Sequence, residues 1–160
     1  MRFLVATLIC LFVFTLGSID GRAQKSADLS QIVALLQKHD DALNQHDLDG
    51  ITSVFAPTEK IVVLGTGPGE RWSGKDGIRG AYTEIIKDFD KGIATRDCNW
   101  KSGEILGETA WLAAMCKFAD SKEGKKCEYE LNVSGVLRRI GGKWYFQSLH
   151  FSNLTGGGAN

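Results

Sequence analysis

The chain has 160 residues, which is close to the roughly 150 residues of one domain. Its 43% hydrophobic and 24% charged residues are typical of a globular protein and exclude a disordered or collagen-like chain. Its 19 basic residues balance its 19 acidic ones. A nucleic-acid-binding domain is usually strongly basic, so we expect no nucleic-acid partner.

The N-terminal segment has the pattern of a secretory signal peptide. Arg2 precedes an apolar run of 15 residues, 3–17, which is shorter than the roughly 20 residues of a membrane span. Small residues at Gly21 and Ala23 indicate cleavage after Ala23. An uncleaved membrane anchor is the alternative. We therefore expect a signal peptide at 1–23, one domain at 24–155, a flexible tail at 156–160, and an exported protein, periplasmic or secreted, without stable membrane insertion after cleavage.

Helix signals occupy the first half of the mature chain. Apolar residues recur at helical spacing from Leu29 to Leu43, on one face that includes Val33. Asp47 is the expected N-cap of a shorter helix that ends before Pro57. A third helix is expected to begin at Ser73, with an apolar face that includes Tyr82.

Strand signals dominate the second half. Short strands are expected at 61–64 and 70–72, followed by four long ones at about 93–106, 109–119, 126–140 and 143–152. The short spacers between the long strands fit antiparallel hairpins. Helices followed by such strands predict an α+β domain with the helices on one face of a curved sheet, which leaves a pocket between them.

Three short motifs, in this order, resemble those of the NTF2-like superfamily, in particular its SnoaL-like and ketosteroid-isomerase-like proteins. They are HDLDGI at 46–51, WSGKDGI at 72–78, and GKW at 142–144 followed by LHFS at 149–152. The resemblance covers residues 28–152. It implies an NTF2-like cone of three N-terminal helices packed on a curved mixed or antiparallel sheet of about five to six strands. It also implies a deep pocket and a dimer formed through the outer face of the sheet.

The isomerase members of that superfamily are a poor chemical match. By the resemblance, His39 takes the place of their oxyanion-stabilising Tyr, and apolar Val63 lies near the place of their catalytic Asp. Residues 134–137, where a second oxyanion acid is expected, contain no carboxylate. Proton abstraction beside a carbonyl needs a base and an oxyanion donor, so we do not expect steroid-isomerase chemistry.

The pocket candidates come from the first helix, the third helix and the last strand. His39 lies on the apolar stripe of the first helix, bordered by Asp40, and is either a core residue or a chemical group. Strand alternation places Trp144, Phe146, Ser148, His150 and Ser152 on one side of the last strand, which the resemblance implies is the inner side. The ligand-binding candidates are His39, Tyr82, Trp144, Phe146, Ser148 and His150.

The other side of the last strand predicts a contact surface. Tyr145, Leu149 and Phe151 alternate with the inner residues and are expected to form an apolar row on the outside. Such a row is too large to be left in water without a partner, so we expect a homodimer.

Cysteine usage predicts one disulfide. Cys98, Cys116 and Cys127 remain after cleavage, and export permits a bridge between two of them. We expect the bridge to include Cys116, with either Cys98 or Cys127 as its partner. Neither the cysteines nor the histidines have metal-ligand spacing, so we expect no metal and no cofactor.

Three functions fit these features. The first, which we favour because the expected pocket has few polar groups, is binding of a small apolar or amphipathic molecule in the cone. The second is a divergent SnoaL-like enzyme, of the isomerase, cyclase or dehydratase type, that uses His39 and His150 for acid–base chemistry. The third is a non-catalytic dimerising scaffold.

Overall fold

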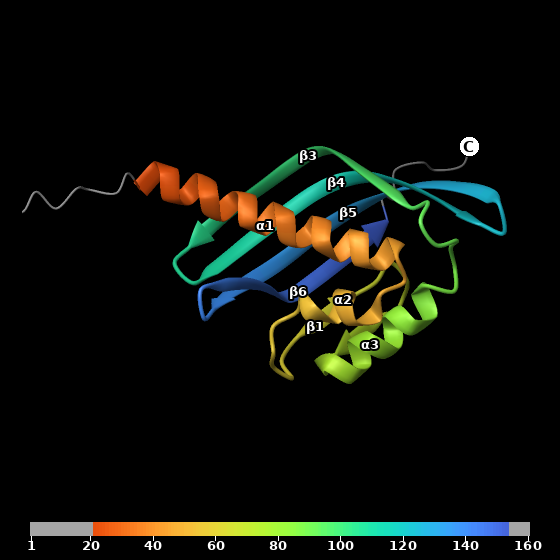
Figure 1. Cartoon of the computed structure of the whole chain (residues 1–160), viewed down its shortest axis with the longest axis horizontal. Helices are drawn as coiled ribbons and strands as arrows, with labels where there is room; N and C mark the ends of the chain where they lie inside the picture. Colours follow the sequence, from red (N-terminus) through yellow and green to blue (C-terminus); the bar gives the residue numbers. More distant parts are fainter. Residues whose placement is uncertain (1–20, 154–160) are drawn as a thin grey trace, which may run out of the picture.

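The computed structural model describes residues 21–153, with side chains from Ser30 onward (Figure 1). Most of the expected signal peptide and the whole expected tail at 156–160 lie outside the described residues. The helices are α1 (Gly21–Asn44), α2 (Leu48–Ser53) and α3 (Gly74–Ile85). The strands are β1 (Val62–Leu64), β2 (Arg71–Ser73), β3 (Thr95–Leu106), β4 (Thr109–Lys122), β5 (Lys125–Ile140) and β6 (Lys143–Asn153). Across the described part of the chain, each helix is too short or too polar to cross a membrane.

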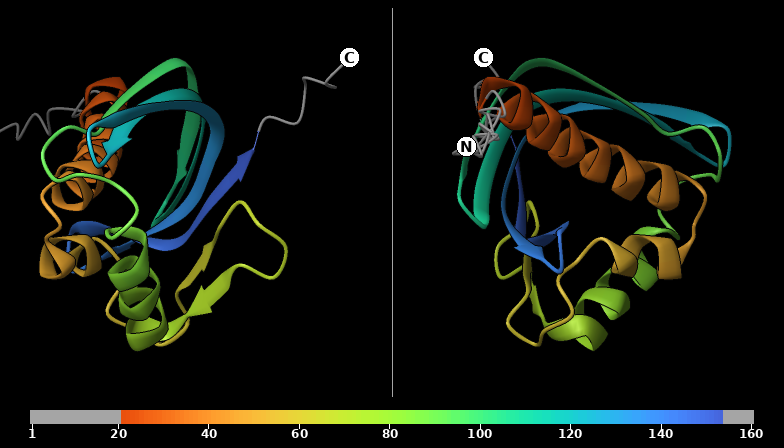
Figure 2. Two further views of the ribbon diagram at one scale, coloured as in Figure 1. Left: turned by 90° about the vertical axis from the view of Figure 1, so that its right-hand side faces the viewer. Right: turned by 60° about the vertical axis from the view of Figure 1, so that its left-hand side comes forward.

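The strands form one six-stranded sheet in the order β2-β1-β6-β5-β4-β3. Only the β1–β6 pair is parallel among the described strands, so the sheet is mixed. The sheet curls around α1, which lies diagonally across its concave side (Figure 2). We call the side that carries α1 the inner face and the opposite side the outer face. The predicted α+β cone is confirmed.

Local sequence signals set the helix ends as expected. The Asp47 carboxylate accepts a hydrogen bond of 2.9 Å from the Gly50 N–H at the start of α2, and α2 ends before Pro57. Ser73 is the N-cap of α3, although its side chain makes no capping hydrogen bond. The apolar stripe of α1 is narrower than expected, because Val33 is 56% exposed while Ile32 and Leu36 are buried.

The core fills the space between α1 and the inner face of the sheet. Every second residue of β4 faces it, and α2 and α3 close one end with the fully buried Ile51 and Ile78. The inner strand residues of β4 are Ala110, Leu112, Ala114 and Cys116.

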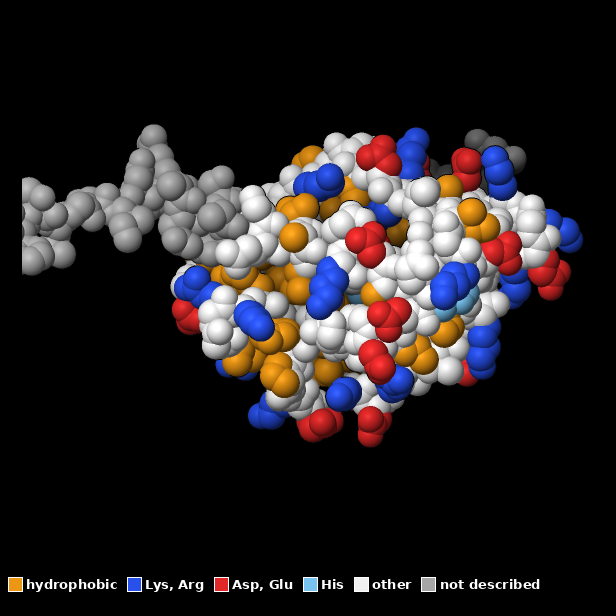
Figure 3. All heavy atoms as spheres, in the orientation of Figure 1, with side chains coloured by type: hydrophobic (Ala, Val, Ile, Leu, Met, Phe, Trp, Pro, Cys, Tyr) orange, Lys and Arg blue, Asp and Glu red, His pale blue; other side chains and the backbone are white. Residues whose placement is uncertain are grey.

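Acidic and basic side chains are interspersed over the molecular face that carries α1 (Figure 3).

A β-bulge interrupts β6 at Gln147. Val136 of β5 pairs with Ser148, whereas the next residue, Leu137, pairs with Phe146, so Gln147 is an extra residue in β6. The Gln147 side-chain amide donates a hydrogen bond to the Lys60 carbonyl. An extra residue reverses the facing of every residue that follows it in a strand.

The bulge corrects two predictions about β6. Trp144 and Phe146 face the core as expected, but beyond the bulge Leu149 is the buried residue and pairs with buried Val63 of β1. Ser148 and His150 therefore lie on the outer face. The expected outer row of Tyr145, Leu149 and Phe151 does not form, because Leu149 and Phe151 pack in the core region.

The tip of the β4–β5 hairpin is held by the loop after α3. The Asp90 carboxylate accepts hydrogen bonds from the Ser121 hydroxyl at 2.6 Å and from the N–H groups of Glu123 and Gly124 at 3.0 Å each. The nearby Lys122 ammonium also lies 2.9 Å from Asp88. The Ser121 hydrogen bond, followed by those of Gly124 and Glu123, lowers the pKa of Asp90.

One disulfide links β3 to β4. Cys98 and Cys116 are cross-strand partners and form the bridge, which confirms the participation of Cys116 and identifies its partner. The register of β3 shifts immediately after Cys98, at Asn99. Among the described cysteines, Cys127 is free and exposed. The bridge therefore fixes β3, an edge strand, beside its irregularity.

Replacing both Cys98 and Cys116 by Ser should lower the free energy of unfolding by about 2–4 kcal/mol, because the bridge restricts the unfolded chain. Urea unfolding under non-reducing conditions measures the change. Cys127→Ser is the matched control and should leave the free energy of unfolding unaltered. Equal losses in the two variants would show that the bridge adds nothing specific.

The Asp90 hydrogen bonds should make stability depend on pH in the acidic range. The folded-state pKa of Asp90 is lowered, so its ionised form stabilises the fold above the unfolded pKa of about 3.9, and this contribution is lost as the pH falls through the folded pKa. Asp90→Asn should melt below the wild type at pH 7, and the difference should shrink below about pH 4. Glu123→Gln is the control, because Glu123 donates to Asp90 through its backbone N–H, which a change of side chain leaves in place. A difference in melting temperature that does not vary with pH would contradict the assignment.

Candidate functional site

A chain of four polar side chains runs through the apolar core from α3 to β3. The Tyr82 hydroxyl lies 2.7 Å from Nε2 of His39, and Nδ1 of His39 lies 3.0 Å from Oδ1 of Asp40. Nη2 of Arg96 lies 2.6 Å from Oδ2 of Asp40. Polar groups in a core are costly to bury, so this chain stands apart from its surroundings.

Aromatic rings enclose His39, which is 0% exposed. Its ring centroid lies 5.4 Å from that of Tyr82, 6.4 Å from that of Phe55 and 6.2 Å from that of Phe151. These neighbours come from α3, the segment after α2, and β6. The imidazole of α1 is therefore the point at which the helices and the last strand meet.

The partners of His39 determine its proton positions. An ionised carboxylate can only accept hydrogen bonds, so Nδ1 donates to Asp40. In a neutral imidazole, Nε2 then accepts from the Tyr82 hydroxyl. Burial, with a smaller contribution from the Asp40 charge, raises the pKa of Tyr82. The Tyr82 hydroxyl therefore stays protonated and acts as a donor.

The other end of the polar chain has an ion pair and one guanidinium nitrogen, Nη1 of Arg96, that is left without a partner in the described structure. Within the described structure, Oδ2 of Asp40 and Nη1 of Arg96 are buried without a hydrogen-bond partner. Arg96 and Asp40 are in ion-pair contact, but their groups are not aligned as a hydrogen bond at Oδ2. Their side chains are 11% and 19% exposed. This end can therefore form further hydrogen bonds, whereas both nitrogens of His39 are occupied.

The chain combines a carboxylate, an imidazole and a phenol in sequence. Such an order orients the imidazole and permits proton transfer between neighbours. Among the described residues, no three His, Cys, Asp or Glu side chains lie close enough together to hold a metal ion.

The structure brings together only part of the predicted site. His39 and Tyr82 are hydrogen-bonded, and Trp144 and Phe146 lie in the core at 4% and 0% exposure. The outward Ser148 and His150 lie away from them, so the expectation that His39 and His150 line one cavity is corrected. The reason is the extra residue at Gln147.

Sequence reasoning missed Arg96. The signal was its position two residues before Cys98, because alternate residues of a strand share a face. A bridge from Cys98 to the core-facing Cys116 directs Cys98 inward, and Arg96 with it. No feature of the sequence near Arg96 identified Asp40 as its partner.

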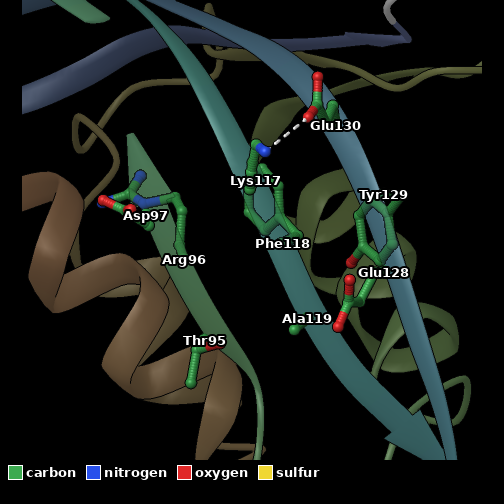
Figure 4. A pocket seen from close by; sticks show the side chains of 9 residues that line it. All are labelled: Thr95, Arg96, Asp97, Lys117, Phe118, Ala119, Glu128, Tyr129 and Glu130. Atoms are coloured by element: carbon green, nitrogen blue, oxygen red, sulfur yellow. Dashed lines mark ion pairs between the residues drawn. The ribbon is translucent and has the colours of Figure 1, made fainter. Parts of the chain in front are cut away.

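An open hollow of about 350 Å³ crosses β3, β4 and β5 (Figure 4). Its nine lining residues form three cross-strand rows, of which the middle row, Arg96, Phe118 and Tyr129, belongs to the inner face. The flanking rows belong to the outer face, and Lys117 and Glu130 form an ion pair of 3.4 Å there. None of the six predicted site residues lines this hollow. The residues of the flanking rows are Thr95, Asp97, Lys117, Ala119, Glu128 and Glu130.

Tyr82→Phe should lower the free energy of unfolding by about 1–3 kcal/mol, because it leaves Nε2 of His39 buried without a donor. Thermal or urea unfolding measures this loss. Tyr145→Phe, at a half-buried position on β6, is the control and should change stability little. Equal stabilities of the wild type and Tyr82→Phe would mean that the hydrogen bond contributes nothing to folding.

Solved structures with this fold are numerous, and three illustrate the match. An NTF2-like superfamily protein from Salmonella enterica has a TM-score of 0.71 at 17% identity, with 84% of this chain and 96% of that one covered. A protein of unknown function from Mycobacterium tuberculosis has a TM-score of 0.70 at 15% identity, with 87% and 77% covered. A protein of unknown function with a cystatin-like fold from Nostoc punctiforme has a TM-score of 0.69 at 16% identity, with 82% and 94% covered.

These identities establish the fold alone. No curated protein matches the sequence of this chain. The family model of the SnoaL-like domain matches residues 32–156, which is most of the protein. The matched range includes all four residues of the buried polar series, Tyr82, His39, Asp40 and Arg96. The protein therefore belongs to the SnoaL-like domain family.

Proposed function

We propose that the protein is an exported binding domain for a small amphipathic molecule. The ligand lies against the inner face of the sheet, and its polar group contacts the Asp40–Arg96 end of the buried polar chain. The observation that carries this proposal is the buried Nη1 of Arg96, which has no hydrogen-bond partner in the described structure and lies beside a carboxylate that Nη2 of Arg96 contacts at 2.6 Å. A buried polar atom without a partner costs free energy, which a ligand that supplies the partner recovers.

The surroundings of Arg96 favour a ligand with an apolar part. Arg96 pairs across strands with Phe118, which pairs with Tyr129, so the three share the inner face. The rings of Phe118 and Tyr129 are stacked, with centroids 5.4 Å apart and planes within 2°. Tyr129 is 43% exposed. An aromatic surface beside a polar group suits a molecule with both kinds of surface.

Two features support export. The Cys98–Cys116 bridge is typical of proteins outside the reducing cytoplasm. The N-terminal apolar run has the length and flanking residues of a signal peptide.

Acid–base catalysis is the second candidate function, and the Asp40–His39–Tyr82 order favours it. In that case His39 is the group that moves a proton, and His150 takes no part because it lies on the outer face. Binding and catalysis differ in one readout. His39→Gln abolishes conversion of a captured molecule if the protein is an enzyme, but a binding domain converts nothing.

Native mass spectrometry of protein exported by a bacterial host tests the binding proposal. We expect a small molecule bound to the wild-type chain, and a lower bound fraction in Arg96→Gln, because that variant loses the donor at Nη1. Lys117→Gln is the matched control, since Lys117 is a cation of the adjacent row that faces the other side of the sheet. A ligand-free wild type, or equal occupancy in a folded Arg96→Gln variant, would contradict the proposal.

A further inference from the structure

The Arg96 end of the buried polar chain carries no net charge. The guanidinium of Arg96 and the carboxylate of Asp40 lie 2.6 Å apart and balance each other. The neighbouring His39 is neutral when its Nε2 accepts a hydrogen bond from the Tyr82 hydroxyl. The guanidinium is thus already paired with an anion. Its remaining nitrogen, Nη1, is a buried donor without a partner among the described residues.

The sheet surface beside Arg96 adds a second carboxylate. Asp120 lies two residues after Phe118 on β4, so its side chain also belongs to the inner face. Its Oδ2 accepts a hydrogen bond of 3.0 Å from the Tyr129 hydroxyl. Arg96 and Asp120 are the charged inner-face residues in the row of Arg96 and in the described rows on either side of it. With Asp40 of α1, the surroundings of Nη1 therefore hold two carboxylates and one cation.

We infer that this charge balance selects an uncharged ligand, which presents a carbonyl or ether oxygen to Nη1 of Arg96, and rejects a carboxylate. The inference rests on the proposed binding function and names the class of polar group that the site takes. An uncharged oxygen supplies the missing acceptor and leaves the pair with Asp40 intact. A ligand carboxylate would compete with Asp40 for one guanidinium, which would leave a buried negative charge without compensation.

Asp40 is the residue that sets this preference. Its Oδ1 lies 3.0 Å from Nδ1 of His39 and its Oδ2 contacts Arg96, so the carboxylate cannot turn to water without losing both contacts. A guanidinium without such a partner binds a carboxylate well, often through two parallel hydrogen bonds. Removing the charge of Asp40 should therefore convert this end of the polar chain into an anion site.

Two probes that differ in charge test the inference. 2-Acetylnaphthalene and 2-naphthoate share one ring system and each presents an oxygen acceptor, but only the second is an anion near neutral pH. Equilibrium dialysis of the wild type should give a dissociation constant for the ketone that is lower by on the order of tenfold or more. In Asp40→Asn this preference should disappear or reverse, because naphthoate gains the guanidinium that Asp40 occupies.

Asp41→Asn is the matched control, because Asp41 is the adjacent, exposed carboxylate of α1. It should leave the ratio of the two dissociation constants unchanged. Asp120→Asn is a second variant, which keeps the Asp40–Arg96 pair and should shift the ratio toward naphthoate by a smaller factor. Melting curves establish that each variant is folded, and Asp120→Asn decides the question if Asp40→Asn does not fold.

The outcomes separate this inference from the binding function on which it rests. Suppose that both probes bind and that Arg96→Gln weakens both. Naphthoate that then binds the wild type as tightly as the ketone would overturn the inference alone, as would a ratio that neither Asp40→Asn nor Asp120→Asn alters. If neither probe binds, or if Arg96→Gln binds both as the wild type does, the proposed binding site is contradicted and the inference fails with it.

Discussion

The extra residue at Gln147 decides what lies on each side of the sheet. Without it, Leu149 and Phe151 would face outward, and each buried side chain of this size contributes about 1.5–3 kcal/mol of hydrophobic stabilisation. Ser148 and His150 would face the core instead, with the cost of burying polar groups. The bulge places Phe151 against His39 and turns Ser148 and His150 to the outer face. The surroundings of the enclosed polar chain and the composition of the outer face therefore both depend on one residue of β6.

Two contacts hold the bulge in place. The Gln147 amide bonds the Lys60 carbonyl, in the segment that leads to β1. On β5, Gly135 lies beside the bulge, where a Cβ would come within 3.1 Å of the Ser148 carbonyl oxygen and 3.2 Å of the Phe146 ring. A side chain at Gly135 would push β5 away from β6, so this glycine serves the close approach of the two strands.

The limits of sequence reasoning follow from the same region. Periodicity and turn residues predicted the helices and hairpins, because each depends on neighbours in the chain. The facing of residues 148–151 also depends on the pairing register with β5, which alternation assumes to be regular. Gly135 was the local sign of irregularity, since an isolated glycine in a strand indicates a bulge or a close approach. Asp40 and Arg96 are 56 positions apart in the sequence. Their pairing is a tertiary contact, and no local sequence pattern predicts it.

Strand β3 contributes to both faces of the sheet, because its consecutive residues Arg96 and Asp97 point to opposite sides. Arg96 ends the polar chain on the inner face, and Asp97 belongs to an outer-face row of the hollow that Arg96 also lines. Within the described sheet, β3 pairs with β4 alone, so it lacks the second neighbour that fixes an interior strand. The Cys98–Cys116 bridge, in the adjacent row, supplies a covalent restraint in place of that neighbour. A displacement of β3 would move Arg96 away from Asp40, so the disulfide constrains the geometry of the proposed binding site as well as the stability of the fold.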